Sequence, residues 1–281
     1  MTVPVASRVQ RWRVLRRSPT FWVGASLILM WIFFAIFGDI VTPYDPLGSP
    51  QDLLHRLEAP SAAHWFGTDS LGRDVQSRVL AGARQVLTVA LSATVLGTIA
   101  GTFIGLTIGY FGGIIDDIVS RILDAFLSIP LVITAMLALA ALGPNVVGVI
   151  VVIGVVFTPI IAKTVRAATL AERQLDYVTA AQLRKENAFY ILFVEMLPNV
   201  SSVIIVEFTV RLGYAIFTVL ALSFLGFGVE PSVPDWGLSI SQHYAFLTGG
   251  VWWPVLFPAL AIASLVVAVN LLADAISHAM E

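Results

Sequence analysis

The sequence predicts an all-α, polytopic membrane protein with six transmembrane helices and both termini in the cytoplasm. Of its 281 residues, 58% are hydrophobic and only 12% are charged, which is more apolar surface than one soluble core of this length needs. Six apolar segments have the length of about 20 residues that spans a hydrocarbon core of about 30 Å. Lys and Arg are distributed unevenly between the connecting segments, and such loops remain in the cytoplasm when they are rich in positive charge.

The predicted spans follow one another after a basic tail. The tail, residues 1–20, holds Arg8, Arg11, Arg13, Arg16 and Arg17. The apolar run behind it ends in bulky Trp and Phe residues and has no clear cleavage site, so we interpret it as a retained helix rather than a signal peptide. The expected spans are residues 21–40, 86–110, 119–142, 145–165, 199–226 and 251–275.

Glycine and proline mark the second and third spans. Four glycines at i+4 spacing, Gly97, Gly101, Gly105 and Gly109, form one stripe on the second span. Small residues let helix backbones approach closely in lipid, so the stripe favours helix packing over a role in a substrate path. In the third span, Pro130 predicts a kink.

Charge in the loops sets the predicted orientation. With the N-terminus inside, eleven Lys and Arg residues face the cytoplasm and four face the outside, which agrees with the positive-inside rule. Residues 41–85 then form an extracytoplasmic loop. Residues 86–281 form the core membrane domain, and its cytoplasmic loop covers residues 166–198.

A charged passage, "DYVTAAQLRKENAFYILFVEMLPN" (residues 176–199), lies between long apolar runs. Residues 168–188 contain no Pro or Gly and have high helix propensity, and Pro198 fits the first turn of the fifth span. One interpretation is an amphipathic helix lying on the lipid headgroups. The other is a docking helix for a cytoplasmic partner, in which Ala180 and Ala181 permit close approach.

Two charged residues lie well inside a predicted span. Glu207 and Arg211 are four residues apart and therefore share one helical face. Charges in lipid are costly unless they pair or face water. The pattern fits either a structural ion pair or a lining of a translocation path.

Four ordered stretches resemble one protein family. Residues 176–199 resemble the cytoplasmic "EAA" loop of ABC importer permeases, with Ala180, Ala181 and the closing Leu-Pro-Asn in register. "HWFGTDSLGRDVQSRVLAGAR" (64–84), "LALSFLGFGVEPSVPDWG" (220–237) and "NLLADAISHAM" (270–280) resemble segments of the dipeptide and oligopeptide permeases, C-type subunit. The resemblance implies the transmembrane-domain fold of type I ABC importers and the permease subunit of an ATP-driven importer of di- or oligopeptides.

The chain departs from the family pattern at three positions of this loop. Thr179 stands where the family usually has Glu, and Glu195 stands where it often has His. Lys185 replaces a Gly that would supply a left-handed turn at no steric cost. We therefore expect this turn to move, for example to Asn187, or to be absent.

The resemblance also implies partners and a location. It implies a second homologous permease, two ATP-binding cytoplasmic subunits that use ATP and Mg²⁺, an extracytoplasmic substrate-binding protein, and a multi-pass position in a bacterial cytoplasmic (inner) membrane. The chain itself shows no GxxxxGK[ST] phosphate loop, so we expect a non-catalytic subunit without a cofactor of its own. The expected ATPase-docking residues are Tyr177, Thr179, Ala180, Ala181, Gln182, Leu183, Lys185 and Asn187. On this interpretation Ala181→Trp leaves the protein in the membrane but uncouples it from ATP hydrolysis.

The extracytoplasmic loop contains four prolines that oppose a continuous helix. Its charged end, with Asp69, Arg73, Asp74 and Arg78, predicts a short amphipathic helix at the outer surface. We expect Asp69, Arg73 and Asp74 to contact a binding protein or to cap the pathway.

Other functions have less support in the sequence. Related permeases carry nickel or other small solutes, so the substrate class stays open. A self-contained secondary transporter would show midplane acidic residues and internal repeats, whereas a membrane enzyme would show a clustered catalytic constellation. The four histidines have no metal-ligand spacing, and a net charge of -2 gives no footprint for nucleic acid.

Overall fold

A computed structural model describes residues 15–48, 50–143, 145–228 and 233–280. Part of the basic tail, with Arg8, Arg11 and Arg13, lies outside these ranges. The described chain is mostly helical and contains no strand, and one isolated bridge joins Thr68 and Asp74. Its helices are α2 (Pro19–Val41), α3 (Val75–Phe111), α4 (Gly113–Leu127), α5 (Leu131–Leu142), α6 (Val146–Glu172), α7 (Asp176–Leu183), α8 (Ala188–Tyr190), α9 (Leu197–Phe224), α10 (Trp236–His243) and α11 (Trp253–Met280), with 3₁₀-helices η1 (Pro50–His55) and η3 (Tyr244–Gly249) and a π-helix η2 (Ile191–Met196).

Five described helices are long and apolar enough to cross a membrane, and the bent pair α4–α5 brings the number to six if it counts as one span. The predicted third span is not one kinked helix, because α4 and α5 meet at 86° around a break that contains Pro130. Pro130 has no backbone N–H and the residue before a proline avoids the α region, so the chain turns there instead of bending gently.

The second span begins eleven residues earlier than the sequence predicts. Asp74 caps it by accepting a hydrogen bond from the backbone N–H of Ser77 at 2.8 Å. At 1.5 Å per residue, the 37 residues of α3 are about 55 Å long. This length exceeds the hydrocarbon core, so α3 extends into the polar region.

The glycine stripe on α3 packs against α6 within the same chain. A Cβ added to Gly97 would lie 2.9 Å from the carbonyl oxygen of Gly154, and one added to Gly105 would lie 2.5 Å from that of Ala162. Both distances are too short for carbon and oxygen. The structure confirms the packing interpretation and places this stripe inside the protein.

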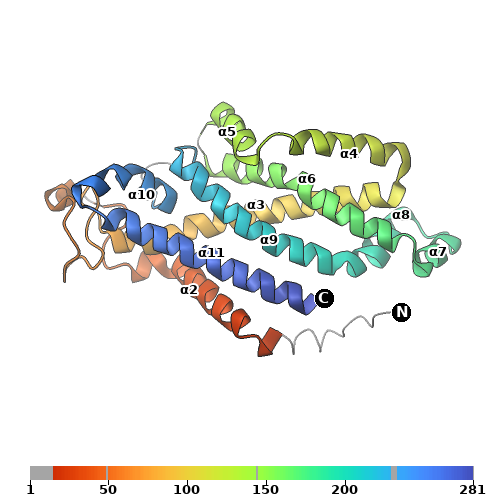
Figure 1. The fold of residues 1–281 in the computed structure, drawn as a ribbon, viewed down its shortest axis with the longest axis horizontal. Helices are drawn as coiled ribbons and strands as arrows, with labels where there is room; N and C mark the ends of the chain where they lie inside the picture. Colours follow the sequence, from red (N-terminus) through yellow and green to blue (C-terminus); the bar gives the residue numbers. More distant parts are fainter. Residues whose placement is uncertain (1–14, 49, 144, 229–232, 281) are drawn as a thin grey trace.

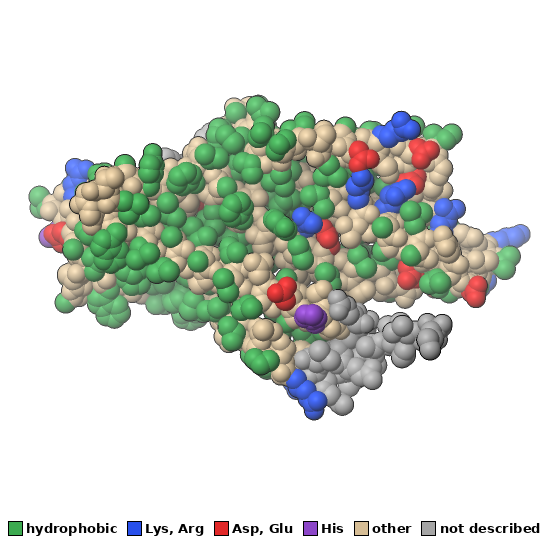
Figure 2. All heavy atoms as spheres, viewed as in Figure 1, with side chains coloured by type: hydrophobic (Ala, Val, Ile, Leu, Met, Phe, Trp, Pro, Cys, Tyr) green, Lys and Arg blue, Asp and Glu red, His purple; other side chains and the backbone are tan. Residues whose placement is uncertain are grey.

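The bundle is elongated, with loops and α10 at one end and the short helices α7 and α8 at the other (Figure 1). We use "loop end" for residues 42–74 and 233–252, which include η1 and α10. We use "α7 end" for residues 173–196, at the opposite end of Figure 1. Figure 2 shows hydrophobic side chains over much of the visible face, with charged side chains gathering where α4, α6 and α7 lie.

Candidate functional site

The first candidate site is α7, which lies between the two long helices α6 and α9. One face of α7 belongs to the core, because Val178 and Ala181 are fully buried. The opposite face is open: Leu183 is 80% exposed, and Thr179, Ala180 and Gln182 are also exposed. An exposed leucine on a short polar helix is a ready contact for a partner.

This burial corrects the expectation for Ala181. The sequence treats the two adjacent alanines alike, but α7 turns by about 100° per residue and buries only the second one. A large side chain at Ala181 would clash inside the chain. Of the two alanines, only Ala180 lies on the open face.

The predicted displacement of the left-handed turn is wrong. Lys185 itself has a φ of 58°, although its side chain has a Cβ. The N–H of Glu186 donates to the carbonyl oxygen of Ala181 at 3.2 Å, and the N–H of Lys185 donates to that of Gln182 at 2.9 Å. These two bonds form a Schellman motif, which holds the turn without glycine.

Asn187 has a different role from the turn expected there. Its side-chain oxygen accepts a hydrogen bond from the N–H of Tyr190 at 2.7 Å and caps α8. The family departure at Glu195 is also explained, since its carboxylate accepts a hydrogen bond from Arg184 Nη2 at 3.0 Å. This ion pair joins the end of α7 to η2. Nothing in the structure explains the Thr179 departure.

Tyr177 fixes the start of α7 to the end of α6. Its hydroxyl donates to Glu172 Oε2 at 2.6 Å. Burial, followed by the neighbouring Glu172 carboxylate, raises the pKa of Tyr177 to about 12. The phenol therefore keeps its proton and remains a donor at neutral pH.

A π-helix connects this segment to α9. Residues 191–196 form it, and the N–H of Leu197 bonds to the carbonyl oxygen of Leu192, five residues back. Pro198 follows at the first turn of α9, where its ring would clash with the carbonyl of Val194 in a regular α-helix. The wider π turn accommodates that ring, so the proline marks the change of register between η2 and α9.

Glu207 and Arg211 form an ion pair, with Arg211 Nε 2.6 Å from Glu207 Oε1, and their side chains are 12% and 16% exposed, respectively. Arg211 also lies over the ring of Tyr214, 5.1 Å from its centroid. Tyr214 borders a groove of about 400 Å³ between α9 and α11. The groove is lined by Val210, Gly213, Tyr214, Phe217, Val266, Asn270, Ala273 and Asp274.

The sequence did not single out Tyr214, Asn270 and Asp274, which line this one groove. Arg211 and Tyr214 are three residues apart on α9, a spacing that places them on one face. Asn270 and Asp274 have the same relation on α11, at i,i+4. Nothing in the sequence shows that these two faces meet.

The third expected site is buried. Asp69 is only 1% exposed, and its carboxylate accepts a hydrogen bond from Arg73 Nε at 2.7 Å. Asp74 caps α3 and binds His64 Nδ1 at 2.9 Å. Asp69, Arg73 and Asp74 thus form a folded turn rather than an amphipathic surface helix, and their burial leaves little of them for a partner to contact.

This turn belongs to a larger polar network at the loop end. The N–H and hydroxyl of Ser70 both lie within hydrogen-bond distance of His243 Nε2, at 3.2 and 2.9 Å. Burial lowers the pKa of His243, so its ring stays neutral and accepts the N–H of Ser70. Burial raises the pKa of Asp235. Its carboxylate accepts a hydrogen bond from the hydroxyl of Ser223, and it caps α10.

Comparisons with known proteins identify the family. The family described as "Binding-protein-dependent transport system inner membrane component" matches residues 97–281. The chain belongs to this family. A second description, "N-terminal TM domain of oligopeptide transport permease C", matches residues 9–60. The chain is therefore a membrane permease component of an ABC transporter in the inner membrane.

Curated relatives match over nearly their whole length. The chain is 38% identical to the dipeptide transport system permease protein DppC of Escherichia coli (strain K12) over 283 residues, which cover 99% of the chain and 94% of the relative. It is 39% identical to the glutathione transport system permease protein GsiD of Salmonella typhimurium over 273 residues, covering 96% and 88%. The di/tripeptide transport system permease protein DppC of Pseudomonas aeruginosa is 35% identical over 262 residues, covering 92% and 86%.

Proposed function

We propose that this chain is the permease subunit of an ATP-driven importer of short peptides, and that its α7 face transmits the movement of an ATP-binding subunit to the membrane helices. The observation that carries the proposal is the two-sided burial of α7. Val178 and Ala181 are fixed in the core while Leu183 is exposed. A force applied to the exposed face therefore reaches the core through packed side chains.

The connections of α7 support this role. Its first turn is bonded to α6 through Tyr177 and Glu172. Its last turn is bonded to η2, and through it to α9, by the ion pair of Arg184 and Glu195. A helix held to two spans can move them together when its partner rotates.

The partners follow from the family. The proposed assembly contains this chain, a second homologous permease, two ATP-binding cytoplasmic subunits that use ATP and Mg²⁺, and an extracytoplasmic substrate-binding protein. The α7 end then faces the cytoplasm and the loop end faces outward. Dipeptides, tripeptides and glutathione are the proposed substrates, because the similar permeases are named for transport of these compounds.

For the binding protein we propose a contact on exposed apolar side chains of the loop end, in place of the buried Asp69, Arg73 and Asp74. Leu54 is 85% exposed, its neighbour Leu53 is also exposed, and Trp65 is exposed later in the same loop. The buried network of Asp69, Arg73 and Asp74 holds this loop in its conformation. These charged residues therefore support the contact indirectly, by fixing the position of the exposed apolar side chains.

Two matched substitutions test the assignment of the two ends. The complete transporter, reconstituted in liposomes, would carry either Leu183→Asp or Leu54→Asp. We expect Leu183→Asp to reduce co-purification of the ATP-binding subunits and peptide uptake at least tenfold. Leu54→Asp should leave co-purification unchanged and reduce only the stimulation of ATP hydrolysis by the binding protein.

Two results would overturn the proposal. If Leu183→Asp binds the ATP-binding subunits and transports as wild type does, α7 is not the docking element. If the purified chain alone moves solute down an ion gradient, a secondary transporter replaces the importer. Uptake of a dipeptide, of glutathione and of Ni²⁺, measured in parallel, decides the substrate class.

A further inference from the structure

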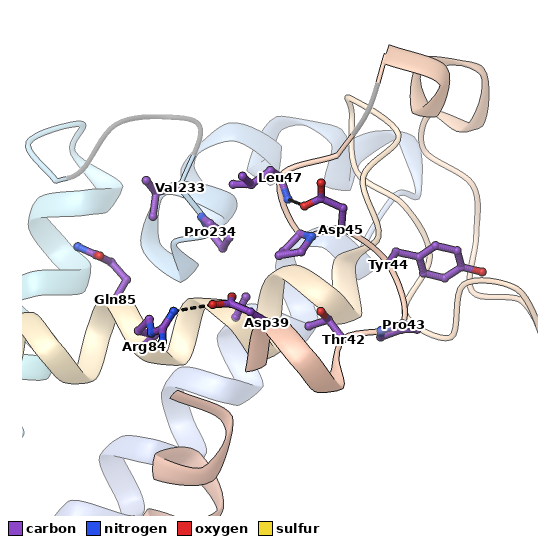
Figure 3. Close-up of a pocket in the computed structure, with 12 residues that line it drawn as sticks. Asp39, Thr42, Pro43, Tyr44, Asp45, Leu47, Arg84, Gln85, Val233 and Pro234 are labelled. Carbon is purple, nitrogen blue, oxygen red and sulfur yellow. Dashed lines mark hydrogen bonds and ion pairs between the residues drawn. The ribbon is translucent and has the colours of Figure 1, made fainter. Parts of the chain in front are cut away.

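A second cavity lies at the loop end, away from α7 and from the α9–α11 groove. Its volume is about 610 Å³, within the range of small-molecule sites. Three separate parts of the chain enclose it: the end of α2 with residues 42–47, the first turns of α3, and residues 233–234. Figure 3 shows Asp39 and Arg84 pointing toward each other on one side, with Val233, Pro234 and Leu47 on the other.

Glycine at one position brings the walls together. A Cβ on Gly38 would lie 3.3 Å from the Cα of Ala81, so α2 approaches α3 closely just below the cavity. Asp39 follows Gly38 directly, and it pairs with Arg84 at the edge of the cavity.

The polar groups of the cavity carry both signs of charge. Arg84 Nη1 and Asp39 Oδ2 form an ion pair whose side chains are 58% and 57% exposed, and such an exposed pair is weak and can open. Asp45 adds a second carboxylate, of which one oxygen accepts the N–H of Leu47.

These groups complement a ligand with an anionic and a cationic part. Arg84 offers charged donors to an anion such as a phosphate. Asp39 and Asp45 offer acceptors to an ammonium group. A ligand of one charge sign would leave the opposite groups of the cavity without a partner.

Exposed apolar side chains lie on α2 in the same turns as Asp39. Phe33, Ile36, Phe37 and Ile40 are all exposed in the last turns before Val41, and α2 is only 17% buried in its most apolar stretch. A polar pocket joined to an exposed apolar helix surface at the end of a span fits a lipid, with its headgroup in the pocket and its acyl chains along the helix.

We propose that the cavity between α2, α3 and residues 233–234 binds a phospholipid whose headgroup carries a primary ammonium group, such as phosphatidylethanolamine. Arg84 binds the phosphate, and Asp39 and Asp45 bind the ammonium. On lipid binding, the exposed ion pair of Arg84 and Asp39 opens, and each side chain pairs with the opposite charge of the headgroup. This site is independent of the proposed transport function, so either can fail alone.

Native mass spectrometry of the purified full chain tests the proposal. The protein is exchanged into micelles that contain phosphatidylethanolamine, phosphatidylglycerol or phosphatidylcholine, and the retained lipid is counted after delipidation. Phosphatidylglycerol has no ammonium group, and the methylated ammonium of phosphatidylcholine cannot donate hydrogen bonds. We expect phosphatidylethanolamine to be retained about tenfold more strongly than the other two.

Substitutions assign the two halves of the headgroup. Arg84→Gln should reduce retention of phosphatidylethanolamine about tenfold. The double variant Asp39→Asn with Asp45→Asn should lose the preference for phosphatidylethanolamine over phosphatidylglycerol while still retaining lipid, a change that misfolding would not produce. As a matched control, Asp124→Asn with Lys163→Gln removes another exposed ion pair and should change neither quantity.

Three results would overturn the lipid assignment. The first is equal retention of the three phospholipids by the wild-type chain, and the second is an unchanged preference in the double aspartate variant. The third is displacement of phosphatidylethanolamine by a free dipeptide, whose amino and carboxylate groups have the same charge pattern. Retention should also persist in the complete transporter, since its loss there would mean that another subunit covers the cavity.

Discussion

At the loop end, charged side chains are buried and bonded to one another, whereas at the α7 end an apolar side chain is exposed. Asp69 is paired with Arg73 beneath the surface, and His243 holds the same turn from α10. At the other end Leu183 points away from the core, and the ion pair of Arg184 and Glu195 is partly accessible to solvent. The buried polar side chains of the loop end thus find their hydrogen-bond partners within the chain.

This difference separates internal support from partner contact. Buried charges are stable only when each has a partner, and loss of one partner leaves the other uncompensated. An exposed leucine, in contrast, adds little to the stability of the chain and gains burial when another protein covers it. Substitutions in the buried polar network of the loop end should therefore unfold the chain, and substitutions on the open face of α7 should uncouple it.

The largest predicted effect concerns the buried network. Asp69→Ala removes the acceptor of Arg73 and an opposite charge near Arg78. Loss of one member of a buried ion pair costs about 3–5 kcal/mol, so thermal unfolding of the purified chain should shift strongly to lower temperature. Glu58→Ala, which removes an exposed pair with His55 in the same loop, should have little effect. Equal shifts in the two variants would contradict the comparison.

The ion pair on α9 gives the next largest effect. Arg211→Ala leaves the largely buried carboxylate of Glu207 without its donor, at a cost of about 1–3 kcal/mol or somewhat more for a charged group. The exchanged pair, Glu207→Arg with Arg211→Glu, should recover the amount of folded protein in the membrane if the pair is structural. Peptide uptake by the exchanged variant distinguishes the alternatives, because an altered substrate preference would place the pair in the translocation path.

The two adjacent alanines of α7 give the sharpest contrast. Ala181→Trp overpacks a fully buried position and should destabilise the chain by about 1–3 kcal/mol. Ala180→Trp changes an exposed position, so its effect on stability should stay within about 0.5 kcal/mol while binding of the ATP-binding subunits falls. Thermal unfolding and co-purification measure the two effects, and the opposite pattern would reverse the faces assigned to α7.

The smallest predicted effect is a gain in stability. Lys185→Gly removes the cost of holding a residue with a Cβ in the left-handed backbone conformation, which is about 1–2 kcal/mol. It also increases the entropy of the unfolded chain, which opposes this gain. We expect a net stabilisation of about 0.5–1 kcal/mol, seen as a higher unfolding temperature. Arg184→Gly, at the preceding right-handed position, should bring no such gain, and a similar gain there would argue against strain at Lys185.

Local patterns in the sequence predicted most of the helices and one of the contacts. Apolar length predicted the spans, and the i,i+4 spacing of Glu207 and Arg211 predicted their ion pair. The same reasoning failed at Lys185, because the residue type suggested a moved turn while two backbone hydrogen bonds held it in place. It also failed for Asp69 and Arg73, whose surroundings come from segments far away in the sequence.

The sequence by itself determined that this protein is a helical membrane permease. A helix in lipid must satisfy its backbone hydrogen bonds locally and must span a fixed thickness, so composition and length are sufficient evidence for a span. Its motifs also determined the family.

Only the tertiary structure decided which polar side chains support the protein from within and which side chains remain for partners. Ser70 and His243 are 173 residues apart in the sequence but bonded in the fold, and the cavity at Arg84 exists because three distant segments meet. Burial depends on what packs against a residue, and no local pattern contains that information.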